Sequence, residues 1–326
     1  MELKTNLNGK SVRKGKLQPM FKEYQEETFL FLVILIILAI SPIFSPEFFS
    51  TYNLFNLLRQ ISYTAIISVG MLLVILIGGI DLSVGSMMQA VGLSSILLLQ
   101  NQVPVWLVVL IGLLFGLFLG LINGVLITFG RLQPFIVTLG TMVIIEGVTL
   151  VITKGKGVSG DVSDSFLMIG AGYLGPIPVP VIIMVLIYLA GYFALTKTVF
   201  GRHIYALGSN RVSAFNSGIN VSKIQILIYS FSGLFAAVAG LLVASRTGAF
   251  QPGGATGMEL NAIAAVVVGG ASLAGGKGTI GGTFLGALLA GLLFNLLVFL
   301  NMNTYIQQFI LGIIILAAVI ISAFRR

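Results

Sequence analysis

The chain of 326 residues has no cysteine, one histidine and few charged side chains, and each shortage excludes a class of function. Without cysteine there is no disulfide, no thiolate metal site and no cysteine nucleophile. The lone His203 cannot build a histidine metal cluster, so we expect neither a metal nor a cofactor. Only 9% of the residues are charged, against roughly a quarter in soluble domains. In their place stand 57% hydrophobic residues and a mean hydropathy of +1.07, which indicate an integral membrane protein in the lipid bilayer.

The formal charge of +8 does not indicate a nucleic-acid partner. The basic residues are scattered between apolar spans and concentrate only before the first one, where membrane topology accounts for them. Residues 1–28 are polar and basic, and the apolar stretch that follows has no small-residue cleavage pattern. We therefore expect a cytoplasmic basic tail, 1–28, on a single transmembrane domain, 29–326.

Ten apolar segments are candidates for spans of about 20 residues, the length that crosses the hydrocarbon core. The sequence thus predicts an all-α, polytopic transmembrane bundle. The ten segments cover residues 28–46, 59–79, 82–100, 104–129, 133–153, 179–197, 224–247, 258–270, 280–300 and 304–323.

The basic residues orient these spans. With the N-terminus inside, most of the 18 Lys and Arg residues fall on the cytoplasmic side, as the positive-inside rule expects. Both termini are then cytoplasmic. The cations predicted outside are Arg59, Lys154, Lys156 and Arg246.

The two halves of the chain echo each other. GIDLSV at 79–84 resembles GMELNA at 257–262, and a Gly-rich span carrying an asparagine follows each, with Asn123 and Asn295. Five spans per half is an odd number, so this repeat would be inverted, 5+5, with discontinuous helices near the midplane. Such repeats place a transport pathway at their interface.

Asp81 is the only charged residue between Arg59 and Arg131, within GGIDLSVG at 78–85. A charge inside a span costs about 3 kcal/mol on insertion scales, so it has either a structural or a functional reason. After two glycines, Asp81 fits a helix break whose next helix it caps by accepting from that helix's first amides. The alternative is a place on the transport pathway, and the two overlap.

Two more carboxylates lie in or beside spans. Glu259 follows a glycine-rich stretch and suits a cap in the same way, with a pathway role as its alternative. Glu146 has no glycine break before it, and is either paired within the bundle or on the pathway. The polar residues predicted along the substrate pathway are Asp81, Ser83, Asn123, Glu146, Glu259, Asn261 and Asn295.

Two glycine-rich regions have structural explanations. Glycines at four-residue spacing in 112–124 predict a close helix-packing seam. The loop GASLAGGKGT at 270–279 superficially resembles a phosphate-binding loop, but that motif needs Gly and Ser or Thr where Ala271 and Gly278 stand. We interpret the loop as a tight turn between spans.

The longest predicted cytoplasmic loop, about 198–223, contains a short helix that Ser209 or Asn210 can cap and that ends at Gly218 in a C′ position. Its apolar stripe includes Tyr205 and Phe215. So short a helix is marginal alone in water. It either packs on its own bundle, docks on another subunit, or is a plain connector.

These motifs together resemble the membrane permease subunits of bacterial ABC importers for monosaccharides, of the ribose type, with autoinducer-2 permeases as close relatives. The resemblance is carried by Phe49–Ser86 with GGIDLSVGS, by Gly201–Lys223 with IYALGSN, and by Glu259–Thr283 with VVVGGASLAGGKGT. It spans nearly the whole chain after the tail. Phe215 and Asn216 depart from the usual family pattern, which affects the detailed fit to the ATPase.

The resemblance implies a transport subunit without its own ATP site, in the bacterial inner membrane. ATP hydrolysis on a separate cytoplasmic ATPase would drive transport, and a periplasmic or lipid-anchored binding protein would deliver the sugar, with the extracellular loop at about 154–178 as a docking surface. A second permease chain, expected to be identical, would share the pathway at the interface, or each bundle would hold its own. The residues that the resemblance assigns to ATPase coupling are Arg202, Tyr205, Gly208, Asn210, Phe215 and Gly218.

A rival interpretation remains at this point. Asp81, Glu146 and Glu259 could relay protons or cations in an ion-coupled secondary transporter or channel. That protein would transport by itself in response to an ion gradient, whereas an ABC permease would not. An intramembrane enzyme is excluded, because the chain lacks a nucleophile with a base and a metal-binding set.

Overall fold

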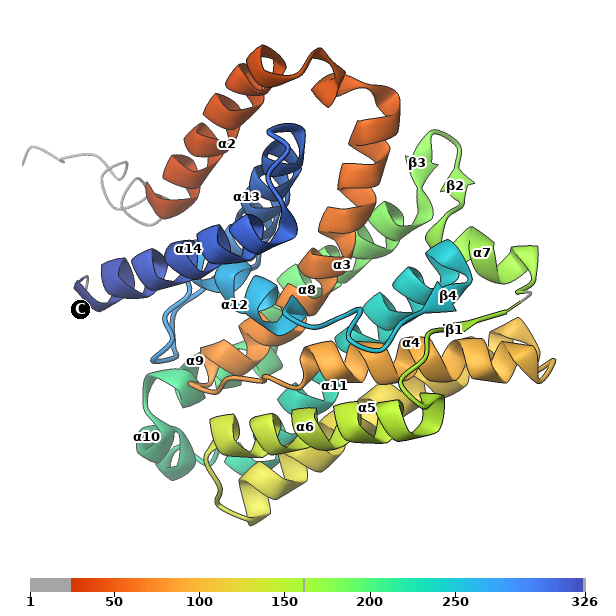
Figure 1. Ribbon diagram of the computed structural model, residues 1–326. Coiled ribbons are helices and arrows are strands. Elements are labelled where there is room, and N and C mark those ends of the chain that lie inside the picture. The colour runs from red at the N-terminus through yellow and green to blue at the C-terminus, as the bar shows by residue number, and fades with distance from the viewer. Residues whose placement is uncertain (1–24, 161, 325–326) are drawn as a thin grey trace, which may run out of the picture.

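The structure, a computed structural model, describes residues 25–160 and 162–324 and is almost entirely helical (Figure 1). The predicted all-α fold is confirmed. Most of the basic tail, Asp161, Arg325 and Arg326 lie outside the described residues. Among the described residues, seven helices are long and apolar enough to cross a membrane, and shorter apolar helical stretches cover 84–100, 258–268 and 305–314. These ten correspond to the ten predicted spans, and the chain is a multi-pass membrane protein.

The spans are the following helices. They comprise α2 (Gln25–Phe44), α3 (Thr51–Leu76), α4 (Val84–Gln100), α5 (Val105–Phe129), α6 (Pro134–Thr153), α8 (Val179–Lys197), α11 (Val221–Thr247), α12 (Met258–Val268), α13 (Ile280–Phe299) and α14 (Thr304–Phe324). The connecting elements are η1 (Pro46–Phe49), α7 (Asp164–Gly170), α9 (Val199–Ser209) and α10 (Arg211–Asn216).

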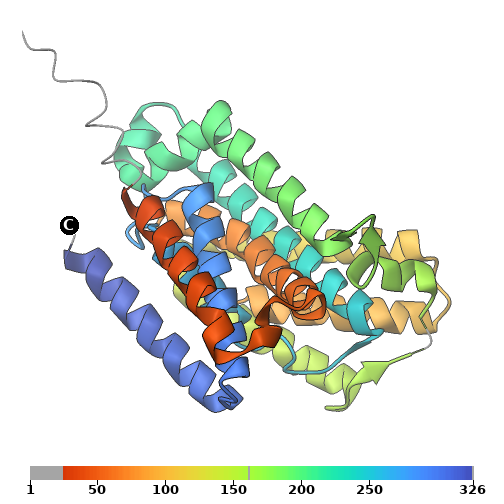
Figure 2. The ribbon, with the colours of Figure 1, turned by 90° about the horizontal axis from the view of Figure 1, so that it is seen from above.

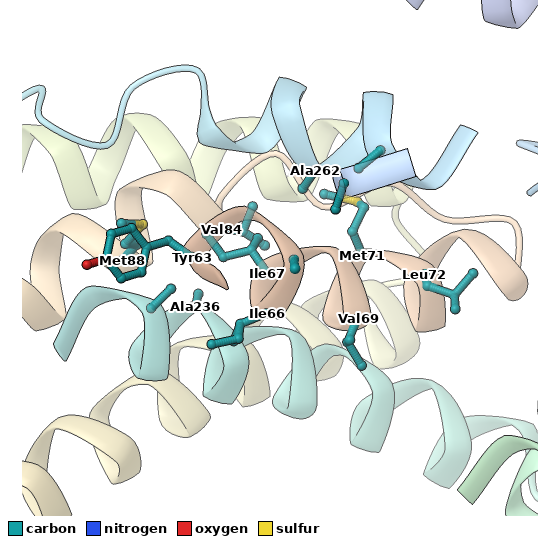
Figure 3. Packing of buried hydrophobic residues seen from close by; sticks show 14 of the residues in the cluster. Tyr63, Ile66, Ile67, Val69, Met71, Leu72, Val84, Met88, Ala236 and Ala262 are labelled. Carbon is teal, nitrogen blue, oxygen red and sulfur yellow. The ribbon is translucent and has the colours of Figure 1, made fainter. Parts of the chain in front are cut away.

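Helices α3 and α11 form the centre of the bundle. Helix α3 packs on α8, α11, α12 and α13, and α11 packs on α3, α4, α5 and α7. From Ile61 to Leu76 nearly every side chain of α3 is buried, as expected for a helix that neighbours cover on all sides. Figure 3 shows its Ile66, Ile67 and Met71 against Ala236 of α11 and Ala262 of α12. The peripheral α6 packs on α4 and α5, and α14 packs on α12.

The predicted glycine seam is confirmed on α5. Gly112, Gly116, Gly120 and Gly124 are all buried and face α11. A β-carbon at Gly120 would overlap the carbonyl oxygen of Tyr229. The backbones of the two helices therefore approach more closely than larger side chains would permit, which is an ordinary packing device in lipid.

The two ends of the bundle carry different elements (Figures 1 and 2). One end holds α9, α10 and the turn before α13. The other holds α7 and two short antiparallel pairs, β1 (Val158–Ser159) with β4 (Ala249–Phe250) and β2 (Tyr173–Leu174) with β3 (Ile177–Pro178). The extracellular loop predicted at 154–178 is thus folded, and α7 packs on α11.

Candidate functional site

The helix break predicted before Asp81 is present between α3 and α4. Helix α3 ends at Leu76, and α4 begins at Val84. Gly78 has a φ of +76°, which a residue with a β-carbon rarely adopts. The break thus turns the chain within the bundle and leaves backbone groups that need partners.

Asp81 is fully buried at this break, and its carboxylate accepts three hydrogen bonds. Its Oδ1 accepts from the backbone amide of Ser83 at 3.0 Å and from the Ser83 hydroxyl at 2.5 Å. Its Oδ2 accepts from the hydroxyl of Ser232 on α11 at 2.8 Å. The sequence predicted that Asp81 would accept from the first amides of α4, and this is wrong in detail. Ser83 is the N-cap residue, Asp81 lies two residues before it, and the Asp81 carboxylate binds the amide and hydroxyl of Ser83.

The network continues into α5. Asn123, also fully buried, donates to the Ser83 hydroxyl at 2.8 Å, while its own Oδ1 has no partner among the described residues. The structure thus brings together Asp81, Ser83 and Asn123, three predicted pathway residues. It adds Ser232, which had no signal in the sequence because a serine beside glycine in an apolar helix also fits plain packing. The four side chains join α4, α5 and α11.

Glu259 makes a related contact at the start of α12. Its Oε1 accepts from the backbone amide of Gly257, the N-cap residue, at 3.0 Å. Here too the carboxylate binds the N-cap amide, although Glu259 follows the cap and Asp81 precedes it. The other carboxylate oxygen lies against Gly85 of α4. Asn261, half-buried, donates only to the sulfur of Met258, and its Oδ1 has no partner among the described residues.

Further polar side chains gather beside Glu259 on α4 and α6. Gln89 of α4 donates to Thr149 of α6 at 2.8 Å and accepts from the backbone amide of Gly253 at 2.6 Å. Glu146 of α6 is half-buried, and its carboxylate interacts electrostatically with that of Glu259. We call Gln89, Glu146, Thr149 and Glu259 the α4 polar cluster. Gln89 and Thr149 were missed in the sequence, where an uncharged polar residue in a span is unremarkable.

Asn295 is separate from both groups. It exchanges two hydrogen bonds with Asn53 of α3, at 3.0 and 2.9 Å. Both amide groups are thereby used in joining α13 to α3. The structure does not bring Asn295 to the other predicted pathway residues.

The segment from Val199 to Gly218 contains two helices where the sequence predicted one, and each has an exposed face and buried residues. In α10, Asn210 accepts from the amide of Ser213 at 2.9 Å, and Gly218 has a φ of +81° after the helix. The predicted cap and C′ glycine are confirmed. The additional α9 is capped by Thr198, whose hydroxyl accepts from Gly201. The sequence TVFG at 198–201 contains this signal, because threonine is a favoured N-cap residue.

Tyr205 and Gly208 attach α9 to the bundle. The Tyr205 hydroxyl donates to the carbonyl of Gly278 at 2.8 Å. Burial raises the pKa of the Tyr205 phenol, so the hydroxyl stays protonated and remains a donor. Gly208 packs on the carbonyl of Leu76 and on Gly276. By contrast, Arg202 and Phe215 are exposed and available to another molecule.

The 270–279 loop is a turn between α12 and α13, and helix rather than strand precedes it. Ser272 donates its amide to the carbonyl of Lys277 at 2.9 Å, and Gly276 donates to Leu76 at 2.8 Å. Its glycines therefore serve a tight turn against α3 and α9.

At the opposite end, the predicted outer cations differ in their surroundings. Arg59 is buried, donates to the carbonyl of Ala171 at 3.0 Å and lies 4.6 Å from the centre of the Tyr173 ring. Arg246 donates to Asn56 at 3.2 Å. Arg59 therefore holds the folded loop and Arg246 joins α11 to α3, whereas Lys154, Lys156 and Asp164 are exposed.

Comparison with known proteins gives a consistent result. The family described as the branched-chain amino acid transport system / permease component matches residues 53–319. The ribose import permease protein of Haemophilus influenzae is 45% identical over 293 residues, which cover 89% of this chain and 91% of that protein. The ribose import permease protein of Bacillus subtilis is 44% identical, with coverage of 90% and 91%. The D-allose transport system permease protein of Escherichia coli is 40% identical, with 89% of each covered. No solved structure matches.

Proposed function

We propose, since the chain belongs to the family of branched-chain amino acid transport system permease components, that it is the permease subunit of an ABC importer for ribose or a related monosaccharide. The observation that carries this proposal is the 44–45% identity to ribose import permeases over about nine-tenths of the chain. The resemblance of GGIDLSVGS to the ribose-type permeases also favours a sugar over an amino acid.

We further propose that ATP is hydrolysed on a separate cytoplasmic ATPase, and that α9 and α10 transmit its movement. The support is twofold. Arg202 and Phe215 are exposed for an ATPase to contact, while Tyr205 and Gly208 on the same segment are fixed to the bundle. Leu76, against which Gly208 packs, is the last residue before the break that leads to Asp81. A displacement of α9 would thus reach the break through backbone contacts.

The substrate pathway in this proposal follows the α4 polar cluster. Within the described chain, the Glu146 carboxylate and the Asn261 Oδ1 have no hydrogen-bond donor, and polar groups within spans are unfavourable when exposed to lipid. A second, identical permease chain would cover this face and enclose a polar path for the sugar. Sugar hydroxyls suit carboxylate and amide partners, so Glu146, Glu259 and Asn261 would contact the substrate. Asp81, Ser83 and Asn123 would instead fix the break beside it.

The proposed location is the bacterial inner membrane, with the end that holds α9 and α10 in the cytoplasm and both termini on that side. The alternating helices support this, because Arg131, Lys197 and Lys223 then lie inside. A periplasmic or lipid-anchored binding protein would deliver sugar to the opposite end, where Lys154, Lys156 and Asp164 are exposed.

The test is reconstitution of the permease in liposomes with the ATPase and the binding protein encoded beside it. We expect uptake of labelled ribose only when all three proteins and ATP are present. The permease alone should give no uptake under a proton or sodium gradient. Gradient-driven uptake by the permease alone would support the ion-coupled transporter and overturn the proposal.

A further inference from the structure

A cleft of about 340 Å³ lies at the end of the bundle that holds α10. Its walls come from the end of α5, the start of α6, the first residue of α10, the first turns of α11 and the break between α3 and α4. The charged, polar and apolar side chains in these walls that could contact a ligand include Thr128, Arg131, Leu132, Arg211, Gln225 and Tyr229. None of these residues is part of the α4 polar cluster.

The cleft is positively charged. Arg131 and Arg211 both line it, and none of the described residues that line it is acidic. The guanidinium of Arg211 donates to Oε1 of the buried Gln225 at 2.8 Å, a neutral acceptor that orients the charge without neutralising it. Asp81 does not line the cleft, although its carboxylate interacts electrostatically with Tyr229 in the wall, and it accepts hydrogen bonds from Ser83 and Ser232. Two cations thus face one space that no acidic side chain of the described residues lines.

Two hydroxyl groups in the same walls lack partners. The hydroxyls of Tyr229 and Thr128 are buried, and neither has a hydrogen-bond partner within the described part of the chain. A buried polar group without a partner is unfavourable by about 1–3 kcal/mol. Both hydroxyls can donate. An anion with several acceptor oxygens would satisfy them together with the two guanidinium groups, and a phosphoryl group has this form.

The surroundings favour a lipid as the source of that phosphoryl group. The cleft lies where α5 ends and α6 begins, and a helix that spans the hydrocarbon core ends at the headgroup region. Leu132 in its wall is half exposed, and the neighbouring Phe129 and Phe135 are exposed as well. Acyl chains could lie along these apolar side chains while the headgroup enters the cleft. Basic pockets between helices at this depth are a known type of site for anionic headgroups.

We propose that this cleft binds the phosphodiester headgroup of an anionic phospholipid. Arg131 and Arg211 bind the phosphate oxygens, and the Tyr229 and Thr128 hydroxyls complete the set of donors. Because Arg211 begins α10 and Gly79 lies in the wall, the bound lipid would connect α10 to the helix break. The proposal does not depend on the identity of the transported sugar or on the ATPase.

The test is native mass spectrometry of the purified full-length permease, in micelles with equal amounts of phosphatidylglycerol and phosphatidylcholine. We expect retained phosphatidylglycerol, and a loss of about fivefold in its apparent affinity for each of Arg131→Gln and Arg211→Gln. Lys197→Gln, which removes an exposed cation at the same end but outside the cleft, should leave retention unchanged. Equal retention of the two lipids by the parent protein would overturn the proposal.

Two further measurements keep the result interpretable. Arg211→Lys retains the charge, so it should retain lipid even if Arg211→Gln fails to fold, and Tyr229→Phe should weaken retention without removing a charge. A parent-like affinity of the folded Arg131→Gln and Tyr229→Phe variants would overturn the site. Inorganic phosphate in millimolar amounts is the second probe. If it displaced the lipid completely and bound as tightly alone, the anion site would stand and the lipid source would be wrong.

Discussion

Gly208 of α9 lies so close to the carbonyl oxygen of Leu76, the last residue of α3, that no β-carbon fits between them. The amide of Gly276 donates to the same carbonyl at 2.8 Å. One carbonyl group thus joins the exposed segment, the turn before α13 and the end of the central helix. Two residues further on, Gly78 begins the break that carries Asp81.

Replacing Gly208 by alanine should therefore uncouple transport. The added methyl group must displace α9 from Leu76, and we expect ATP-driven sugar uptake to fall at least about tenfold, within the range of typical coupling energies. Uptake in reconstituted liposomes measures this, with membrane insertion checked by protein yield. Gly312→Ala is the matched control, since a β-carbon there has no atom of the described chain within 4 Å. Parent-like uptake by Gly208→Ala would argue against α9 as the transmitting element.

Arg202→Gln should lower uptake by about two- to fivefold, the size expected for one exposed charge at an interface. The exposed side chain of Arg202 has no hydrogen bond within the described part of the chain, so its replacement should leave the fold unchanged. Uptake in reconstituted liposomes measures the loss, and co-purification of the ATPase with the permease at rising salt shows whether it arises from weaker association. Weaker association with unchanged thermal unfolding supports a contact with the ATPase, whereas unchanged association places that contact elsewhere.

Asp81→Asn and Asp81→Ala should differ sharply. Asparagine keeps an oxygen for the Ser83 amide, and its NH2 group can reach Ser232, so we expect a mild loss of stability. Alanine leaves the Ser83 amide and the Ser83 and Ser232 hydroxyls without their acceptor, at about 1–3 kcal/mol for each buried group. Thermal unfolding in detergent compares the two. A folded Asp81→Asn variant without uptake would instead mean that the charge is needed for transport.

The sequence was sufficient for the features that depend on local order. The apolar segments predicted the ten helices, of which seven described ones are long enough to span a membrane. Two glycines before Asp81 predicted the break, and Asn210 with Gly218 predicted α10. Each signal lies within a few residues of the feature it specifies. The inverted relation of the two halves remains a prediction.

The contacts between distant segments were not predictable from the sequence. Ser232 is 151 positions from Asp81, and Asn53 is 242 from Asn295. Serine and asparagine in an apolar helix carry no mark of their partner, because partner choice depends on how the helices cross. Nothing in the sequence marks Asn295, which is predicted on the pathway, as the partner of Asn53.

That pair gives a prediction about stability alone. Asn295→Ala and Asn53→Ala should each lower the unfolding temperature, and the double variant should lower it by less than their sum, because each single change leaves the remaining asparagine without its amide partner on the other helix. The KM for sugar should not change, since neither amide has a free group to offer. A raised KM for Asn295→Ala at unchanged stability would support the predicted place of Asn295 on the pathway.

Glu259→Gln should raise the KM for sugar by about fivefold, because a hydrogen bond to a charged acceptor is stronger than one to a neutral amide by about 1 kcal/mol. Glutamine can still accept from the Gly257 amide, so the start of α12 and the thermal stability should be preserved. Glu146→Gln should shift the KM in the same direction if both carboxylates face the sugar. Glu47→Gln, an exposed carboxylate in η1, is the matched control and should change nothing. Initial uptake rates over a range of ribose concentrations measure the KM. If Glu259→Gln transports like the parent while Glu259→Ala loses only stability, the carboxylate is a helix cap and the sugar passes elsewhere.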